Sequence, residues 1–462
     1  MGRSVKSIEL FEWDSGTTDC SFLSKSEKKT LIKFNETLKK RDKNDAITIN
    51  YNEKLVTYSY VGIVQIGKKR IEILPKLFND SKNSQLIASN PEIKRNARKN
   101  LFSILSFCGL IPVHKSEMSV YDQQKDFFEF LVSLFLDDLE KALIAQLHRE
   151  YISYDDEIPF LRGKINLTKE IVKPPTKKHH FFCVYDEFSA DNQFNRIIKA
   201  SLKRIKELCK YEDNRKRADR LYILMDEVND SIITLQSFSK ISITRLNENY
   251  REIIQFCKLI LFGETISSDS GAENFYALIF DMNLVFERYI AKLLRNSFPE
   301  KYQFHYQEPL RLASDQKGKT DLKRNKKELR PDILVKIDNQ EKFQNHAIID
   351  TKYKLALARD KSVAISDLYQ MMAYCVASET DKAILIYPSL PQQEILNEKD
   401  FWIFLDKLTV ETDNTSKKGD GGGRVVHISA RSIQILSKHG NKILHHLLED
   451  DRITIEQLLI ET

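Results

Sequence analysis

Hydrophobic and polar positions divide the chain into stretches of different periodicity. Up to about residue 85, short apolar runs with alternating polar positions are typical of strands, and one stretch has helical spacing. The expected strands lie at 7–13, 47–50, 55–64 and 70–74, with a helix at 24–40. From about residue 91 to Gly263, apolar residues recur every 3.6 positions, most clearly over 127–146. The pattern therefore predicts a β-rich N-terminal domain over 1–85 and a mainly helical middle domain over 86–263.

The remaining stretch, 264–462, mixes helical and strand patterns. It predicts a helix over 275–298, then two strands joined by a polar segment, a helix over 364–377 and a strand over 383–387. This order is typical of a mixed α/β sheet with helices on both faces. The expected fold class is therefore multidomain α+β, with a β-rich N-terminal part, a helical middle and a C-terminal mixed α/β domain.

The two central strands of this last domain each carry one acidic residue. Asp332 precedes an apolar run, and Asp350 directly follows Ala347-Ile348-Ile349, where a carboxylate is costly without a partner. Because side chains alternate along a strand, Asp350 and Lys352 share a face, and a hairpin would place Asp332 opposite them. Two carboxylates and an ammonium beside a sheet are suited to a Mg²⁺ site that hydrolyses a phosphodiester.

A simpler interpretation of the Asp-x-Lys triplet is a strand end with a surface ion pair, since the same triplet occurs at 80–82 and 321–323. Neither of those copies follows an apolar run. The helix that comes after Asp350 also favours a functional site, because Gln370 and Tyr374 are four residues apart and share one face.

These residues resemble a known signature. Pro331-Asp332 with Asp350-Thr351-Lys352 resembles the PD-(D/E)XK nuclease motif, and Gln370-x-x-x-Tyr374 is similar to a motif that follows it in several branches. Other segments resemble the McrC family, the nuclease subunits of McrBC-type restriction systems. The similar segments are 61–67, 71–76, 148–151, 161–165, 186–189, 191–192, 195–198, 245–247, 281–283 and 286–287. The resemblance extends from about residue 55 to about residue 390.

The resemblance implies a Mg²⁺-dependent endonuclease that cleaves double-stranded DNA in host defence, with Mn²⁺ as an alternative ion. The implied metal ligands are Asp332, Asp350, Thr351 through its backbone carbonyl, and Glu287. Lys352 would orient or activate the attacking water, and Gln370 would complete the catalytic group. For Glu287, an ordinary surface glutamate on a helix is an equally good interpretation.

A partner is implied as well, because McrC proteins act with hexameric McrB-type AAA+ GTPases. This chain contains no Gly-x-x-x-x-Gly-Lys-Ser/Thr run, and Gly421-Gly422-Gly423 lacks the residues that would follow it in a phosphate-binding loop. The motor must therefore be a separate chain. The basic hairpin turn Lys68-Lys69-Arg70 is a candidate for insertion into the partner ring, and an exposed turn without that role explains it equally well.

Composition adds little. The 462 residues carry a net charge of +6, which permits nucleic-acid binding without requiring it. Six scattered cysteines and the lack of any apolar run near 20 residues predict a cytoplasmic protein without a membrane span. Two alternatives remain open: a structural or regulatory adaptor of the AAA+ motor with a weak or silent nuclease site, and a nuclease of repair or mobile-element processing.

Overall fold

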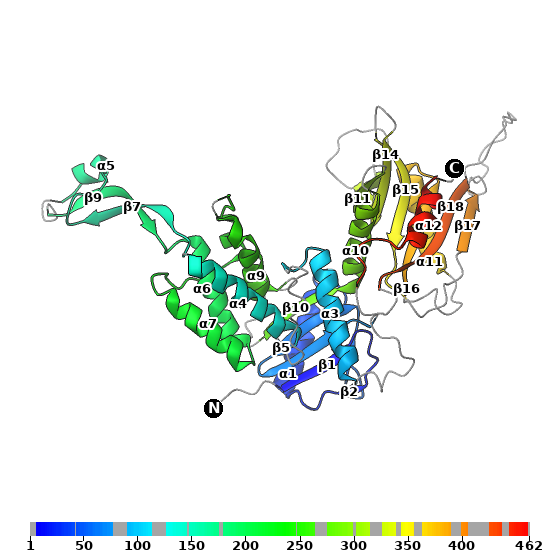
Figure 1. The fold of residues 1–462 in the computed structure, drawn as a ribbon, viewed down its shortest axis with the longest axis horizontal. Helices are drawn as coiled ribbons and strands as arrows, with labels where there is room; N and C mark the ends of the chain where they lie inside the picture. Colours follow the sequence, from blue (N-terminus) through cyan, green and yellow to red (C-terminus); the bar gives the residue numbers. More distant parts are fainter. Residues whose placement is uncertain are drawn as a thin grey trace.

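The structure is a computed structural model, and it describes residues 6–41, 43–76, 90–112, 126–145, 147–174, 179–245, 247–263, 275–298, 302–314, 326–338, 343–354, 363–389, 399–404, 425–436 and 443–460. The molecule is elongated (Figure 1). A four-stranded sheet lies at its centre, a bundle of helices with a projecting arm extends to one side, and a six-stranded sheet lies on the other.

The central, N-terminal sheet has the order β1-β6-β5-β10. Its strands are β1 (Lys6–Phe11), β6 (Lys69–Leu74), β5 (Tyr60–Ile66) and β10 (Phe275–Asp281). Helix α1 (Lys25–Lys39), which begins with a capping box at Ser24 and Glu27, packs its apolar side against one face of the sheet. A small sheet of β2 (Thr18–Asp19), β4 (Lys54–Thr57) and β3 (Ile47–Ile49) lies beside it.

Strand β10 corrects the start of the helix predicted over 275–298, which begins only at Met282, and the predicted boundary at 263/264. Residues 275–280 are all buried, so this strand lacks the alternation of polar and apolar residues by which a half-exposed strand is recognised in a sequence. It pairs antiparallel with β5. Gly62 makes this close pairing feasible. Its φ is +120°, and a Cβ there would lie 2.2 Å from the Leu278 carbonyl oxygen. The N-terminal sheet therefore takes one strand from beyond the helical region.

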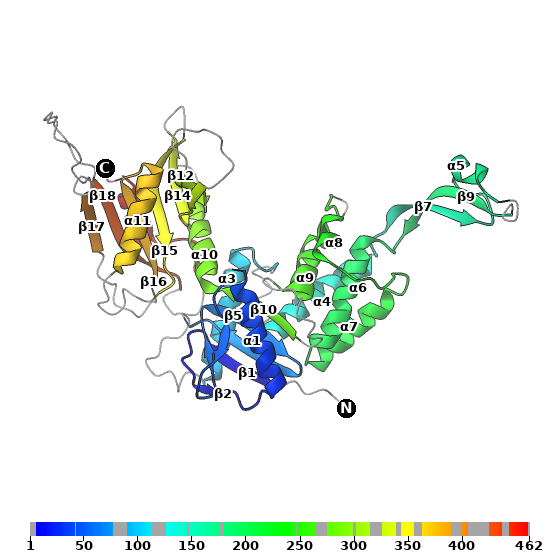
Figure 2. The same cartoon turned by 180° about the vertical axis from the view of Figure 1, so that it is seen from behind.

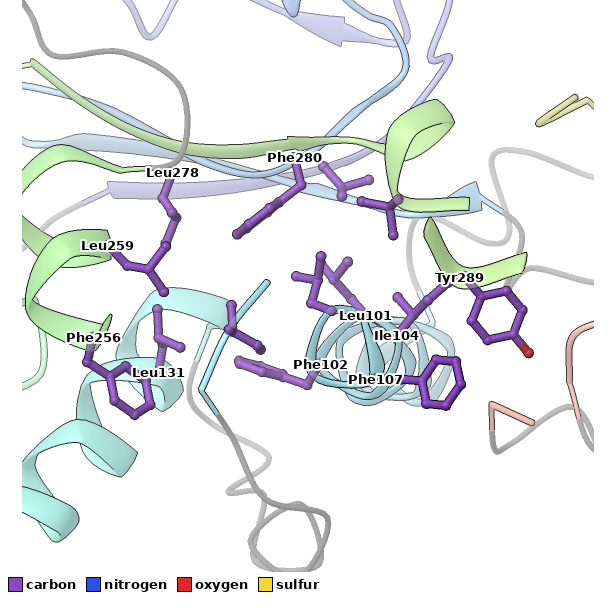
Figure 3. Close-up of a cluster of buried hydrophobic side chains, with 14 of the residues drawn as sticks. Leu101, Phe102, Ile104, Phe107, Leu131, Phe256, Leu259, Leu278, Phe280 and Tyr289 are labelled. Carbon is purple, nitrogen blue, oxygen red and sulfur yellow. The ribbon is translucent and has the colours of Figure 1, made fainter. Parts of the chain in front are cut away.

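The helical body packs on the other face of this sheet. It consists of α4 (Phe127–Ala145), α6 (Gln193–Leu208), α7 (Glu212–Leu224), α8 (Leu235–Ser239) and α9 (Arg251–Phe262), and α3 (Pro91–Phe107) lies beside it. Figure 3 shows side chains of α3, α4 and α9 meeting Leu278 and Phe280 of β10. The same apolar core continues to Tyr289 on α10 (Met282–Ser297), so it joins the helical body to the C-terminal half.

The predicted helical middle contains a sheet as well, which we call the arm. Strands β7 (Glu150–Ile158) and β9 (Phe181–Ser189) pair along their whole length, and β8 (Lys164–Ile165) and the short helix α5 (Leu167–Ile171) cover part of β9. The arm projects away from the helical body (Figure 2). Most of its residues are exposed on both faces, so no apolar face marks its strands in the sequence.

Two asparagines at the start of α6, Asn192 and Asn195, fix the base of the arm. Asn192 caps α6, and both Asn192 and Asn195 donate to the His148 carbonyl, at 2.9 and 2.7 Å. Asp191 forms a two-point ion pair with Arg196. These bonds tie the first residue of the arm to the first turn of α6, so this motif has a structural role here.

The C-terminal, six-stranded sheet has the order β11-β14-β15-β16-β18-β17. Its strands are β11 (Tyr302–Tyr306), β14 (Ile333–Asp338), β15 (Phe343–Thr351), β16 (Lys382–Ser389), β18 (Val425–Gln434) and β17 (Lys399–Phe404). Pairs β15–β16 and β16–β18 are parallel and the others antiparallel, so the sheet is mixed as predicted.

Helices cover both faces of this sheet. Helix α11 (Ile365–Ser378) lies on one face, while α10 and α12 (Glu449–Ile460) lie on the other. A two-stranded ribbon of β12 (Leu310–Ser314) and β13 (Lys326–Leu329) packs near α11. Within the ranges given above, no helix is both long enough and apolar enough to cross a membrane.

Candidate active site

The predicted hairpin forms, and it places Asp332 beside the end of β15. Strands β14 and β15 pair antiparallel, with Ile333 opposite Ile349. The Thr351 amide and hydroxyl both donate to Asp332 Oδ2, at 2.7 and 2.8 Å. Thr351, expected to offer its carbonyl to a metal, therefore holds the Asp332 carboxylate through its other polar groups. The two hydrogen bonds from Thr351 therefore fix the orientation of the Asp332 carboxylate.

Asp350 and Lys352 lie on one face of β15, as the alternation of side chains predicts. Lys352 Nζ is 2.7 Å from Asp350 Oδ2 and donates to Gln370 Oε1 at 2.9 Å. Gln370 in turn donates to the Tyr374 hydroxyl at 2.8 Å, and that hydroxyl donates to the Arg330 carbonyl. The Gln370–Tyr374 pair on α11 thus positions the lysine, and a chain of polar contacts links the helix to both strands of the hairpin.

Glu287 is not the ordinary surface glutamate that the sequence left open. It is buried on α10, and Gln307 donates to its carboxylate at 2.8 Å. Burial and the nearby negative charge of Asp332 raise the pKa of Glu287 to about 8. The same two causes raise the pKa of Asp350 to about 7. Three carboxyl groups from α10, β14 and β15 therefore repel one another in a poorly solvated place.

Lys352 is the ammonium that faces these carboxyl groups. Burial alone would lower the pKa of Lys352, but the carboxylates of Asp350, Asp367 and Asp332 together outweigh burial and raise it. A lysine with a raised pKa carries its positive charge throughout the neutral pH range. Its arrangement therefore suits the orientation of a ligand and the neutralisation of negative charge better than the removal of a proton.

Gln307 is a site residue that the sequence analysis missed. Its φ is +49°, in the left-handed region that non-glycine residues rarely adopt. Its backbone N–H donates to the Asp332 carbonyl at 3.0 Å while its side chain holds Glu287. A strained residue that contacts two candidate ligands is a frequent feature of functional sites. No sequence signal marks it, because it lies just after β11 with no motif around it.

The predicted basic tip Lys68-Lys69-Arg70 needs a correction. Lys68 is exposed and Lys69 pairs with Glu27, but Arg70 is completely buried. Its guanidinium bonds Asp126, Glu129, Gln65 and the Leu208 carbonyl. Arg70 therefore joins the N-terminal sheet to the helical body and cannot reach a partner surface. The burial of Arg70 could not be predicted from its place beside an exposed turn. Side chains of neighbouring strand residues point to opposite faces, so Arg70 faces the core while Lys69 does not.

Fold and site together define a mixed α/β protein of several sheets with a carboxylate–lysine centre at the end of a β-hairpin. The family model for the McrBC 5-methylcytosine restriction system component matches residues 55–388, more than half of the chain. The chain belongs to this family. A search of the curated proteins found no match.

Two solved structures resemble the chain. One is a refined half-complex from a tetradecameric assembly of Thermococcus gammatolerans McrB AAA+ hexamers with bound McrC, at a TM-score of 0.66 and 20% identity over 98% of this chain and 100% of that chain. The other is the Thermococcus gammatolerans McrBC complex, at a TM-score of 0.50 and 24% identity over 63% of this chain and 87% of that chain. At these identities the likeness concerns the fold.

Proposed function

We propose that this chain is the Mg²⁺-dependent endonuclease subunit of a McrBC-type restriction system, with a C-terminal PD-(D/E)XK domain. One observation carries the proposal: Lys352 contacts both Asp350 and Gln370, and Asp332 and Glu287 face the same place. A surface ion pair would need neither the burial of Asp350, which is 1% exposed, nor the second and third carboxyl groups.

The residues present fit a divalent cation. Asp350 Oδ2 contacts the Lys352 ammonium at 2.7 Å, and the Asp332 and Asp350 carboxylates supply the oxygen donors that a hard cation prefers. Mutual repulsion that raises the pKa of several carboxyl groups is relieved when a cation binds between them. Within the same described ranges, no three His, Cys, Asp or Glu side chains are close enough to hold a metal ion by themselves. Water and substrate oxygens would complete the coordination, as is usual for Mg²⁺.

Each residue then has a distinct role. Asp332 and Asp350 would hold Mg²⁺ or Mn²⁺ together with water and substrate oxygens, and the Glu287 carboxyl of α10 would add negative charge beside them. The ion supplies Lewis-acid stabilisation of the charge that develops on the phosphoryl oxygens. Lys352 orients the attacking water and offsets part of the same charge, and Gln370 keeps the lysine in place. The expected substrate is double-stranded DNA.

The expected partner is a hexameric AAA+ GTPase of the McrB type, by analogy with the McrB-bound McrC chain described above. Since Arg70 is buried, we propose the arm as the surface that contacts the ring in place of the predicted turn. Ile171 and Val172 at its far end are 82% and 80% exposed. Exposed apolar residues on a projecting element are typical of a protein-binding surface.

The test is cleavage of plasmid DNA, methylated and unmethylated, with Mg²⁺, by the chain alone and with an AAA+ GTPase of the McrB type and GTP. Asp350→Asn keeps the shape of the side chain and should lower the cleavage rate by at least about a hundredfold. Asp400→Asn changes a carboxylate on the edge strand β17 of the same sheet and serves as the matched control.

Three outcomes would count against parts of the proposal. Undiminished cleavage by Asp350→Asn would refute the site. Cleavage by the chain alone would point to an autonomous nuclease of repair or mobile-element processing. Stimulation of the GTPase without any cleavage would favour the regulatory adaptor with a silent nuclease site.

A further inference from the structure

A single hydrogen bond connects the N-terminal sheet to the residue that follows Lys352. The Tyr353 hydroxyl donates to Glu12 Oε1 at 2.6 Å, between residues 341 positions apart. Both side chains are buried, at 8% exposed for Tyr353 and 1% for Glu12. Neither residue belongs to the proposed catalytic group, and no motif marked them in the sequence.

Glu12 is held firmly on the N-terminal side. It follows β1, and its backbone N–H donates to the Leu74 carbonyl at 2.9 Å, which continues the pairing with β6. The Lys76 amide donates to the same carboxylate oxygen as Tyr353, at 2.7 Å. Glu12 Oε2 is buried and makes no hydrogen bond within the described part of the chain. The carboxyl group is thus a rigid acceptor fixed by the N-terminal sheet.

Tyr353 stands where β15 leaves the C-terminal sheet. The Lys352 amide still bonds to the Ile386 carbonyl of β16, at 2.9 Å, and Tyr353 is the next residue. Its ring packs against Phe286, with ring centroids 5.7 Å apart, and Phe286 is the neighbour of Glu287. Tyr353 therefore connects two elements that hold candidate site residues: the end of β15, where Lys352 lies, and helix α10, where Glu287 lies.

Helix α10 is tied to the N-terminal sheet as well. It continues directly from β10, and the Met282 amide at its start donates to the Ser59 carbonyl at 2.8 Å. The N-terminal sheet consequently fixes both α10 and the end of β15. If the bond to Glu12 is lost, the end of β15 loses a polar anchor to the N-terminal sheet that α10 keeps, and Lys352 can shift relative to Glu287.

We propose that Glu12 is a positioning residue of the candidate active site, which it orients across the domain junction through Tyr353. The expected effect of Glu12 on the rate of cleavage rests on the proposed nuclease function. Misplacement of a reacting group by about 1 Å can cost roughly a hundredfold in rate. The Glu12–Tyr353 bond therefore affects the rate of cleavage much more than the binding of DNA or of the AAA+ partner.

Tyr353→Phe is the test, because it removes the hydroxyl and keeps the ring. Tyr276→Phe is the matched control: this tyrosine is equally buried, and its hydroxyl makes one hydrogen bond, to the Leu259 carbonyl at 3.0 Å, away from the site. Tyr353→Phe should lower the cleavage rate constant at saturating DNA and Mg²⁺ by roughly ten- to a hundredfold, with unchanged DNA affinity and GTPase stimulation. Glu12→Ala should act alike, and Glu12→Gln, which keeps an acceptor, should restore most of the rate.

A second measurement does not depend on nuclease activity. Hydrogen exchange of the amides at 351–354 should be faster in Tyr353→Phe than in wild type and unchanged in Tyr276→Phe. Wild-type exchange in Tyr353→Phe, or equal rate losses in Tyr353→Phe and Tyr276→Phe, would overturn the positioning role. A wild-type chain that cuts no DNA would refute the proposed function instead, and hydrogen exchange would still decide whether Glu12 holds the strand end.

Discussion

Arg70 offers the sharpest test of how the N-terminal sheet and the helical body are joined. Its side chain is completely buried, and its guanidinium makes an ion pair with Asp126 at 2.9 Å and another with Glu129 at 3.0 Å. Burial alone would raise the pKa of Asp126, but Arg70 and Lys210 outweigh it and hold that pKa at about 2. Asp126 is therefore ionised inside the protein and depends on the cation.

Arg70→Ala removes the shared partner of two buried carboxylates. Asp126 keeps an ion pair with Lys210, and Glu129 keeps hydrogen bonds from the Lys210 amide and Asn214, so neither is left wholly without a partner. Breaking a buried ion pair from one side typically costs about 3–5 kcal/mol, and we expect a loss of that size. Lys68→Ala, at the exposed neighbouring turn position, should change stability by less than about 0.5 kcal/mol.

Urea unfolding followed by circular dichroism measures both variants. Arg70→Lys keeps the charge but not the planar fork that reaches Asp126, Glu129 and Gln65 together, so it should recover only part of the loss. A stable Arg70→Ala variant with reduced GTPase stimulation would refute this reasoning and restore the surface role predicted from the sequence.

Three further predictions follow from other contacts. Gln307→Ala and Gln307→Gly should both slow cleavage about tenfold, since both release Glu287, but the glycine variant should be more stable by about 1 kcal/mol in urea unfolding because φ is +49°; equal stabilities would exclude backbone strain. Burial raises the pKa of Glu12 from 4.5 to about 8, so the folded state retains a proton that the unfolded chain releases, and stability should fall by a few kcal/mol as the pH rises from about 5 to 8; a pH series of urea unfolding should show a flatter profile for Glu12→Gln. Ile171→Ser with Val172→Ser should weaken partner-stimulated GTPase activity without a change in stability, whereas Ile223→Ser, at an apolar residue of α7 that is 63% exposed, should not; identical GTPase rates in all variants would exclude the arm.

Local sequence patterns were sufficient for much of the candidate site. Alternation along β15 placed Asp350 and Lys352 together, and the four-residue spacing on α11 placed Gln370 and Tyr374 together. These are rules of a single strand or helix, so they hold wherever the element packs. The pairing of β14 with β15 also followed from the short polar segment between two apolar runs.

Patterns failed where a strand is buried on both faces or on neither face, because the sequence then shows no alternation of apolar and polar positions. Strand β10 is apolar on both faces and resembled the start of a helix, and the arm has no buried face at all. Arg70 followed an exposed lysine turn, yet it ends in the core because the helical body packs on its face of β6. For β10 and Arg70 the deciding partners, strand β5 and the acids Asp126 and Glu129, lie more than fifty residues away along the chain.

The sequence by itself determined the residues of the hairpin centre, the mixed sheet that carries them and the family to which the chain belongs, because these depend on local spacing and on motifs. Only the tertiary structure decided that Glu287 and Gln307 join the centre, that Arg70 is internal and that Glu12 reaches Tyr353. Those relations arise when separate elements pack together, and the energy of a buried charge or hydrogen bond depends on neighbours that chain order does not reveal.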